Sequence, residues 1–289
     1  MKYRHAFHAG NFADVHKHVT LLACLTALLR KNKGFLYAET HAGAGLYDLR
    51  SHSARQADEA GDGIERLLDF AHRHPPTPDS LLSHYLQLVA VARQETGIRQ
   101  SYPGSPWLAL SQLRSQDRAA LHEIDAADCA ALERTSHGPA AVRVTQADGY
   151  RALRALLPPI ERRALVLIDP PYEEADEDRR KICTTLGDSL QRFATGVYVI
   201  WYPLKLAGER DRWLRQLAAV CDAASPNKRD WLSSELWVHA LDSRTSLAGS
   251  GMFVVNPPFQ LAAELLSANT ALAAALAGPL GGFAVLDKL

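Results

Sequence analysis

The sequence predicts an α/β fold built around one sheet of seven mostly parallel strands, with a small helical insertion. Residues 164–168 form a continuous apolar run, which is typical of a parallel strand buried on both faces. Residues 35–39 form another short strand, which leads into the glycine-rich turn Gly43-Ala44-Gly45. Because strand-like and helix-like segments alternate along much of the remaining chain, an open α/β sheet is the expected architecture.

The other elements follow in chain order. The apolar residues 19–29 predict a buried helix, with Asp14 placed to cap it. Strands are expected near residues 35–39, 120–124, 142–144, 164–168, 196–202, 236–241 and 251–255. These segments account for the seven strands of the expected sheet.

The stretch between the first two strands is several times longer than the dozen or so residues that a βα crossover needs. Apolar residues recur at helical spacing over 64–71 and 81–92. We therefore expect an inserted helical subdomain at residues 50–100, with residues 1–49 and 101–289 forming the main domain. The insertion is interpreted either as structural padding or as a cap that faces the substrate.

Composition limits the possible functions. The 289 residues include 32 basic and 32 acidic side chains, so nucleic acid could be bound only through local basic clusters. Four scattered cysteines without a C-x-x-C pair favour a reducing cytosol over a zinc site or a disulfide framework. The apolar segment 19–29 is too short to span a bilayer and leads into basic residues rather than a cleavage site, so we expect a cytoplasmic protein.

The strand at residues 164–168 ends in the tetrad Asp169-Pro170-Pro171-Tyr172. Ligands of open α/β sheets bind at the carboxyl ends of strands. An exocyclic amine is a poor nucleophile, because its lone pair is delocalised into the ring. A carboxylate and the Pro170 carbonyl could each accept one N–H and localise that lone pair toward a methyl donor, while Tyr172 offers a face for a flipped base. The tetrad therefore suggests amino methylation, although a simple proline stop with a loop tyrosine would look the same.

Three further features are consistent with a nucleoside cofactor. The glycine turn lacks the third glycine of the dinucleotide fingerprint, since residue 48 is Asp, and this suits a cofactor without a pyrophosphate. Glu123 at the end of the second strand is placed for ribose hydroxyls, and Asp148 after the third strand for an adenine amino group. Either acid could instead be a helix cap or a turn residue.

Asn256-Pro257-Pro258-Phe259 repeats the tetrad pattern after the seventh strand. In a seven-stranded methyltransferase sheet the seventh strand is antiparallel to its neighbours, so its end points away from the cofactor edge. We therefore assign the chemistry to Asp169 and not to Asn256.

The first eighteen residues contain four histidines together with Asn11, Asp14 and Lys17. A solvated, slightly basic tail is one interpretation. The alternative is a polar segment held by the helix that follows, which fixes His16, Lys17 and His18 in its first turns. A metal cluster would need further ligands that the segment lacks.

Several motifs together resemble one family. The tetrad at 169–172 with His41-Ala42-Gly43-Ala44-Gly45 is similar to adenosylmethionine-dependent adenine-N6 methyltransferases. The leader Tyr3-Arg4-His5-Ala6-Phe7-His8-Ala9-Gly10-Asn11, followed by Ala13-Asp14 and Lys17-His18, is more specific. With Tyr102-Pro103-Gly104-Ser105-Pro106, Phe193-Ala194-Thr195-Gly196 and Trp201-Tyr202-Pro203, it resembles the bacterial 23S ribosomal RNA adenine-N6 methyltransferase J family over nearly the whole chain.

The resemblance implies a Rossmann-like methyltransferase that uses S-adenosylmethionine to modify N6 of one adenine in 23S rRNA. The matching positions place cofactor contacts at Lys17, His18, His41, Ser105, Glu123, Asp148, Gly149 and Asp169. Asp169, Pro170 and Tyr172 are the expected catalytic residues, and Tyr3, His5 and Lys17 are expected to contact the RNA or shape its pocket. We expect a monomer that needs no metal.

Three other functions are compatible with parts of the sequence. DNA adenine methylation would use the same tetrad, but a large target-recognition region is missing. Methylation of a protein glutamine poses the same chemical problem, although Asn-Pro-Pro-Tyr is the usual tetrad there. A non-catalytic RNA-binding module would not need candidate residues at every cofactor position.

Overall fold

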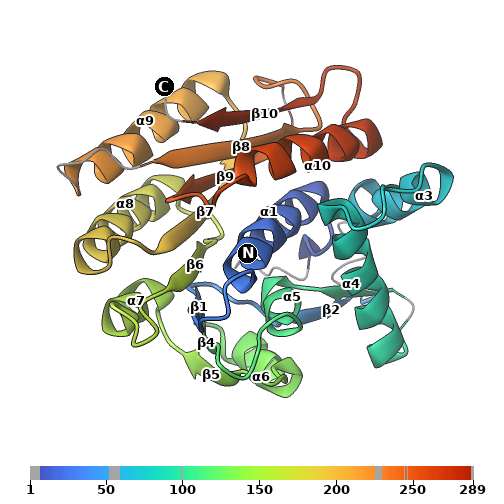
Figure 1. Ribbon diagram of the computed structural model, residues 1–289. Helices are drawn as coiled ribbons and strands as arrows, with labels where there is room; N and C mark the ends of the chain where they lie inside the picture. Colours follow the sequence, from blue (N-terminus) through green and yellow to red (C-terminus); the bar gives the residue numbers. More distant parts are fainter. Residues whose placement is uncertain are drawn as a thin grey trace.

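The computed structural model describes residues 7–51, 59–98, 100–224, 230–243, 245 and 247–287 (Figure 1). In these residues the main sheet has eight strands, in the order β10-β8-β9-β7-β6-β1-β4-β5. Their bounds are β1 Leu36–Glu39, β4 Arg118–Glu123, β5 Ala141–Gln146, β6 Ala164–Ile168, β7 Val197–Leu204, β8 Trp231–Trp237, β9 Gly249–Val255 and β10 Gly282–Asp287. A separate antiparallel pair joins β2 (Leu46–Asp48) to β3 (Ser101–Pro103).

Strands β5, β4, β1, β6 and β7 are parallel neighbours, and β9 is antiparallel to both β7 and β8. All five parallel strands therefore end at one side of the sheet, which we call the carboxyl edge, whereas β9 ends at the opposite side, the amino edge. Every residue of β6 is buried, as expected for a central parallel strand. The predicted fold class is confirmed, and so is the antiparallel direction of the strand before Asn256.

Two details of the sheet differ from the prediction. The sheet has an eighth strand, because β10 pairs antiparallel with β8 and covers an edge that would otherwise expose unpaired backbone groups. The strand expected at 236–241 instead occupies Trp231–Trp237. Its inner positions Ser233, Ser234 and Glu235 are fully buried although they are polar, so hydrophobicity alone did not reveal them.

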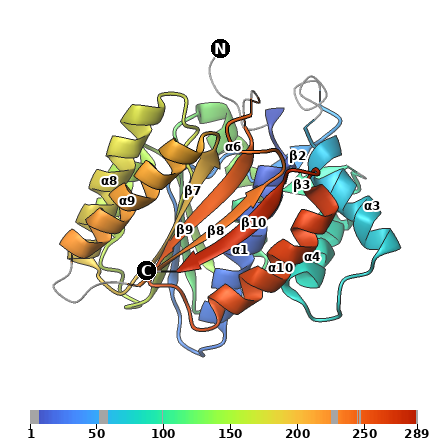
Figure 2. The same ribbon diagram turned by 90° about the horizontal axis from the view of Figure 1, so that it is seen from above.

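Helices cover both faces of the sheet. Figure 2 shows α8 (Ala175–Arg192) and α9 (Ala207–Ala223) on one side, and α1 (Phe12–Leu29) with α10 (Leu261–Leu276) on the other. Three further helices belong to the main domain: α5 Ser105–Leu110, α6 Ala126–Thr135 and α7 Gly149–Leu156. The sheet is thus the middle layer of a three-layer fold, which explains why β6 is apolar throughout.

Helix α1 lies against the middle of the sheet. Its cap is Asn11, whose side chain accepts a hydrogen bond from the Asp14 N–H, so the expected capping role of Asp14 is wrong. By length and mean hydropathy this helix could span a membrane, but 78% of that window is buried inside the protein. The polar residues His16, Lys17 and His18 are buried with it.

The insertion contains a π-helical turn (Gly61–Glu65) and helices α3 (Arg66–Arg73) and α4 (Leu81–Thr96). Its apolar residues Leu67, Tyr85 and Val89 belong to the same hydrophobic core as Leu21 and Leu25 of α1. Helical structure is therefore present where it was expected, packed directly on the main domain. The domain boundaries at 50 and 100 stay a prediction.

Candidate active site

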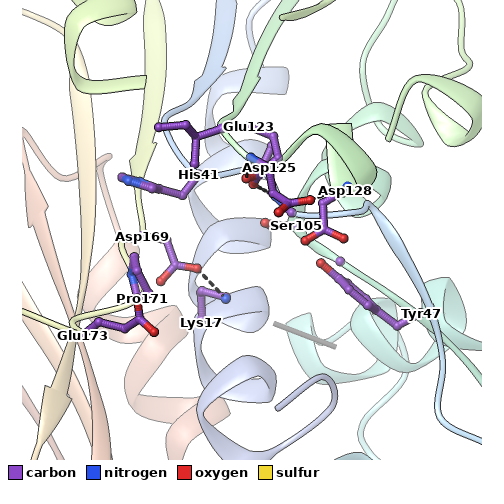
Figure 3. A pocket seen from close by; sticks show the side chains of 14 residues that line it. Lys17, His41, Tyr47, Ser105, Glu123, Asp125, Asp128, Asp169, Pro171 and Glu173 are labelled. Atoms are coloured by element: carbon purple, nitrogen blue, oxygen red, sulfur yellow. Dashed lines mark hydrogen bonds and ion pairs between the residues drawn. The ribbon is translucent and has the colours of Figure 1, made fainter. Parts of the chain in front are cut away.

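Two cavities meet at the carboxyl edge of the sheet. The first, which we call the glycine-turn cavity, has a volume of about 180 Å³ and lies between His41, Gly43, Ser105 and Glu123 (Figure 3). The second, the tyrosine cavity, has a volume of about 230 Å³ and is bounded by Tyr172, Trp201 and Pro203. Lys17, Asp169 and Pro171 line both cavities. A substrate group bound by Asp169 in one cavity can therefore point toward a ligand in the other cavity.

Lys17 fixes the carboxylate of Asp169. The Lys17 Nζ atom lies 2.6 Å from Asp169 Oδ2 and 2.8 Å from Asp14 Oδ1, and the Lys17 side chain is only 5% exposed. Burial alone would lower the pKa of Lys17, but the two carboxylates outweigh it and hold the pKa well above its ordinary value. Lys17 is therefore a permanent ammonium group that orients one oxygen of Asp169.

The glycine turn is held in place from two sides. Gly43 and Gly45 have φ angles of 61° and 78°, which glycine adopts without strain. The Gly43 N–H donates to Glu123 Oε2 at 2.8 Å, and the Ala44 N–H donates to the Tyr47 hydroxyl at 3.0 Å. A Cβ atom at Gly43 would lie 2.3 Å from that hydroxyl oxygen, so a larger residue there would have to displace the Tyr47 hydroxyl.

Negative charge dominates the glycine-turn cavity. Its described lining includes the carboxylates of Glu123, Asp125, Asp128, Asp169 and Glu173, whereas Lys17 is its single lysine or arginine. Figure 3 shows Glu123, Asp125 and Asp128 grouped opposite Asp169. Such a lining favours a cationic ligand over an anionic one, because like charges at close range repel.

Glu39 bonds to Ser105 of the glycine-turn cavity but lies outside the described lining of both cavities, and the sequence analysis did not single it out. It ends β1 beside the turn and is 1% exposed. The hydroxyls of Tyr37 and Ser105 both donate to its carboxyl group, Ser105 at 3.1 Å. Burial raises its pKa to about 8. An acid directly before a glycine turn was the available signal in the sequence.

An aromatic wall bounds the tyrosine cavity. Tyr172 has a φ of 54°, and its hydroxyl donates to the Trp201 backbone carbonyl at 2.7 Å. The two rings meet edge to face, with centroids 5.5 Å apart. These contacts fix the Tyr172 ring beside Asp169, so the predicted neighbourhood of the two residues has a definite geometry.

The other predicted contacts vary in position. Asp148 caps α7 by accepting hydrogen bonds from the Tyr150 and Arg151 N–H groups. Gly149 passes so close to β1 that a Cβ would lie 2.0 Å from the Thr40 oxygen. Both lie at the carboxyl edge, but outside the described lining of the two cavities.

Two histidines also differ in their surroundings. His18 is fully buried, bonds to the Tyr102 hydroxyl at 2.9 Å and does not line either cavity. His41 lines the glycine-turn cavity and packs edge-on against Tyr150; burial lowers its pKa, which favours the neutral ring. Tyr3 and His5 lie outside the described residues.

Asn256 lies at the amino edge, away from both cavities. Its amide nitrogen donates to the carbonyls of Ala194 at 3.0 Å and Gly196 at 2.7 Å. Among the described residues, no group of three or more His, Cys, Asp or Glu side chains is arranged to hold a metal ion. The sheet order and the position of the site at the carboxyl edge define the class as a Rossmann-like methyltransferase.

Comparison with known proteins specifies the family. The model of the family described as RsmJ, "Ribosomal RNA large subunit methyltransferase D, RlmJ", matches residues 32–287. The chain therefore belongs to this family, and the resemblance noted from the leader and the tetrad is confirmed.

Individual relatives agree along most of the chain. "Ribosomal RNA large subunit methyltransferase J" of Escherichia coli K12 is 38% identical, and that of Haemophilus influenzae 37%; both alignments cover 92% of this chain and 90% of the relative. The solved structure of protein LPL1258 from Legionella pneumophila has a TM-score of 0.82 and 32% identity, covering 97% of this chain and 98% of that one.

Proposed function

We propose that this protein transfers the methyl group of S-adenosylmethionine to the N6 amino group of one adenine in 23S rRNA. Membership of the family and the names of two curated relatives support the substrate class. The observation that carries the chemistry is the position of Asp169 in the wall between two cavities. A base in the tyrosine cavity would present its amino group past Asp169 to a methyl donor in the glycine-turn cavity.

The residues of the glycine-turn cavity fit this cofactor. Its acidic lining suits a sulfonium, a cation that supplies an activated methyl group when bound. Glu123 is placed for ribose hydroxyls, and Ser105, His41, Lys17 and Asp169 surround the remaining space. Contacts with Asp148, Gly149 and His18 are part of the proposal, although these three would act from outside the described lining.

The protein's own groups would activate the amine by orientation. Lys17 binds Asp169 Oδ2, which leaves Oδ1 to accept an N–H of the adenine. The Pro170 carbonyl would accept the other N–H, and the fixed ring of Tyr172 would stack on the base. Positioning and hydrogen bonding of this kind account for large rate enhancements without a covalent intermediate.

The test uses labelled S-adenosylmethionine with 23S rRNA and, in parallel, with duplex DNA of matched length. We expect N6-methyladenosine at one position of the rRNA, mapped by nuclease digestion and mass spectrometry, and none in DNA. Asp169→Ala should bind cofactor but leave the RNA unmodified. Methylation of DNA alone, or wild-type turnover by Asp169→Ala, would refute the proposal.

Two parts of the proposal concern the state of the protein. We propose that it acts as a monomer in the cytoplasm. Light scattering at micromolar concentration should give a mass close to the 31.7 kDa of one chain. A dimer mass would contradict this part.

A further inference from the structure

A third cavity, which we call the side cavity, opens next to the tyrosine cavity. It has a volume of about 550 Å³ and lies between the start of α1, the insertion, and the segments that follow β8 and α10. His8, Asn11 and Leu247 line both the side cavity and the tyrosine cavity. The two spaces are therefore adjacent along one continuous wall, and the volume is within the range of pockets that hold small organic ligands.

The junction between the two cavities is polar and hydrogen-bonded. Glu59 accepts hydrogen bonds from His8 Nδ1 at 2.9 Å and from Asn11 Nδ2 at 2.9 Å. The bond to Glu59 raises the pKa of His8, so the ring at the junction tends toward a cation. Asn11 is also the cap of α1, the helix that carries Lys17. The start of α1 therefore connects the junction to the Asp169 site.

The lining of the side cavity combines apolar groups with charged groups of both signs. Phe12, Val238 and Leu276 provide apolar surface, and Arg66 and His239 are exposed side chains in its wall. In the described part of the chain Arg66 has no ion-pair partner, although many other arginines do. Asp62 also lines the cavity, and Glu59 is engaged by His8. An aromatic and apolar floor with a free guanidinium suits a nucleotide.

We propose that the side cavity binds the ribonucleotide next to the target adenosine, with its phosphate near His8 and Arg66. This inference rests on the proposed function, because it assumes that the target adenine occupies the tyrosine cavity and that the RNA strand continues from there into the side cavity. Asp169 and Lys17 bound that cavity on the cofactor side, whereas His8 and Asn11 line both it and the larger space. The neighbouring nucleotide would then contribute to binding, and the protein would select adenines by their context.

The first test compares two arginines of helix α3. Arg66→Gln removes the guanidinium in the side cavity, whereas Arg73→Gln removes an exposed one outside its lining. With 23S rRNA as substrate, Arg66→Gln should raise KM about five- to tenfold, leave kcat within about twofold, and reduce the slope of log KM against log salt by about 0.7, as expected for one lost phosphate contact. Arg66→Lys should restore most of the slope.

The second test changes the RNA. A short RNA containing the mapped adenine is made with an abasic residue on its 5′ side or on its 3′ side. One of the two should raise the wild-type KM at least about fivefold, since a stacked base typically contributes that much or more. In Arg66→Gln the same abasic RNA should raise KM by a smaller factor than it does in the wild type.

Three results would overturn the inference. Arg66→Gln could keep the wild-type KM and salt slope. Arg73→Gln could change KM and the salt slope as much as Arg66→Gln does. Finally, both abasic RNAs could have the same KM as the parent RNA. Each of these would leave rRNA methylation by the wild type intact. Absence of rRNA methylation by the wild type would instead refute the proposed function, and the inference with it.

Discussion

The chain contains two tetrads of the same pattern at opposite edges of one sheet. Each begins with a short polar residue directly after a fully buried strand and continues with two prolines and an aromatic ring. At the carboxyl edge, Asp169 lines two cavities and bonds to Lys17. At the amino edge, Asn256 is bound by two backbone carbonyls.

The aromatic residues of the two tetrads differ in the same way. Tyr172 bonds to the Trp201 carbonyl and faces the tyrosine cavity, whereas Phe259 is 84% exposed. Asp169 is held by Lys17, which lies near the start of α1. The direction of the preceding strand therefore decides which tetrad lies at the cavities. The sequence pattern of the tetrad does not decide this.

The largest expected effect is on catalysis. Asp169→Ala should lower kcat for rRNA by about 10³-fold or more, because it removes the acceptor that orients the amine. Asn256→Ala, the matched change at the other edge, should keep kcat within about twofold. Single-turnover methylation at saturating cofactor measures both, and equal losses in the two variants would break the comparison.

The next effect is on stability. Lys17→Met would leave the buried carboxylates of Asp14 and Asp169 without their shared cation, which typically destabilises a protein by about 3–5 kcal/mol. Urea denaturation should show this loss. The double variant Lys17→Met with Asp14→Asn should recover part of it, because one unpaired charge is removed. Similar midpoints for the single variant and the wild type would contradict the role of the ion pair.

Parts of the fold and site were accessible from the sequence for physical reasons. Residues 164–168 are apolar throughout because both faces are covered, so the central strand and Asp169 were easy to place. Strand β8 was misplaced because its buried positions are polar; Glu235, for example, pairs with Arg210 and Tyr202.

Long-range pairing was the main information that the sequence lacked. Lys17 and Asp169 are 152 residues apart, and nothing in either segment indicates their contact. Glu39 was missed because its importance comes from the hydroxyls of Tyr37 and Ser105, which approach it in the folded protein. Such partners depend on how strands and helices meet, and local patterns do not encode this.

The amino edge provides a prediction of its own. Asn256→Ala removes two hydrogen bonds and places alanine at a φ of 54°, so it should destabilise the protein by about 2–3 kcal/mol. Asn256→Gly removes the same bonds but tolerates that backbone angle, so its loss should be smaller. Thermal and urea unfolding of both variants measure the difference. Equal losses would show that the backbone angle contributes little.

Taken per pH unit, the smallest effect is the dependence of stability on pH, which should come from Glu39 at the carboxyl edge. Burial raises the pKa of Glu39 to about 8 from an ordinary value of 4.5, so the folded state keeps this proton between those pH values while the unfolded state loses it. Stability should therefore fall as pH rises through this window, by up to about 1.4 kcal/mol per pH unit from this group. Glu39→Gln cannot titrate and should flatten the profile.

The difference between the two profiles isolates Glu39. Burial lowers the pKa of His16 to about 3, which gives an opposite slope below its ordinary value of 6.5, but this contribution is common to both proteins and cancels in the difference. Urea unfolding at intervals from pH 5 to pH 9 provides the profiles. Asn256→Ala should shift the whole profile without changing its slope, since Asn256 carries no titratable group. If Glu39→Gln kept the wild-type slope, the pH dependence would not originate from Glu39.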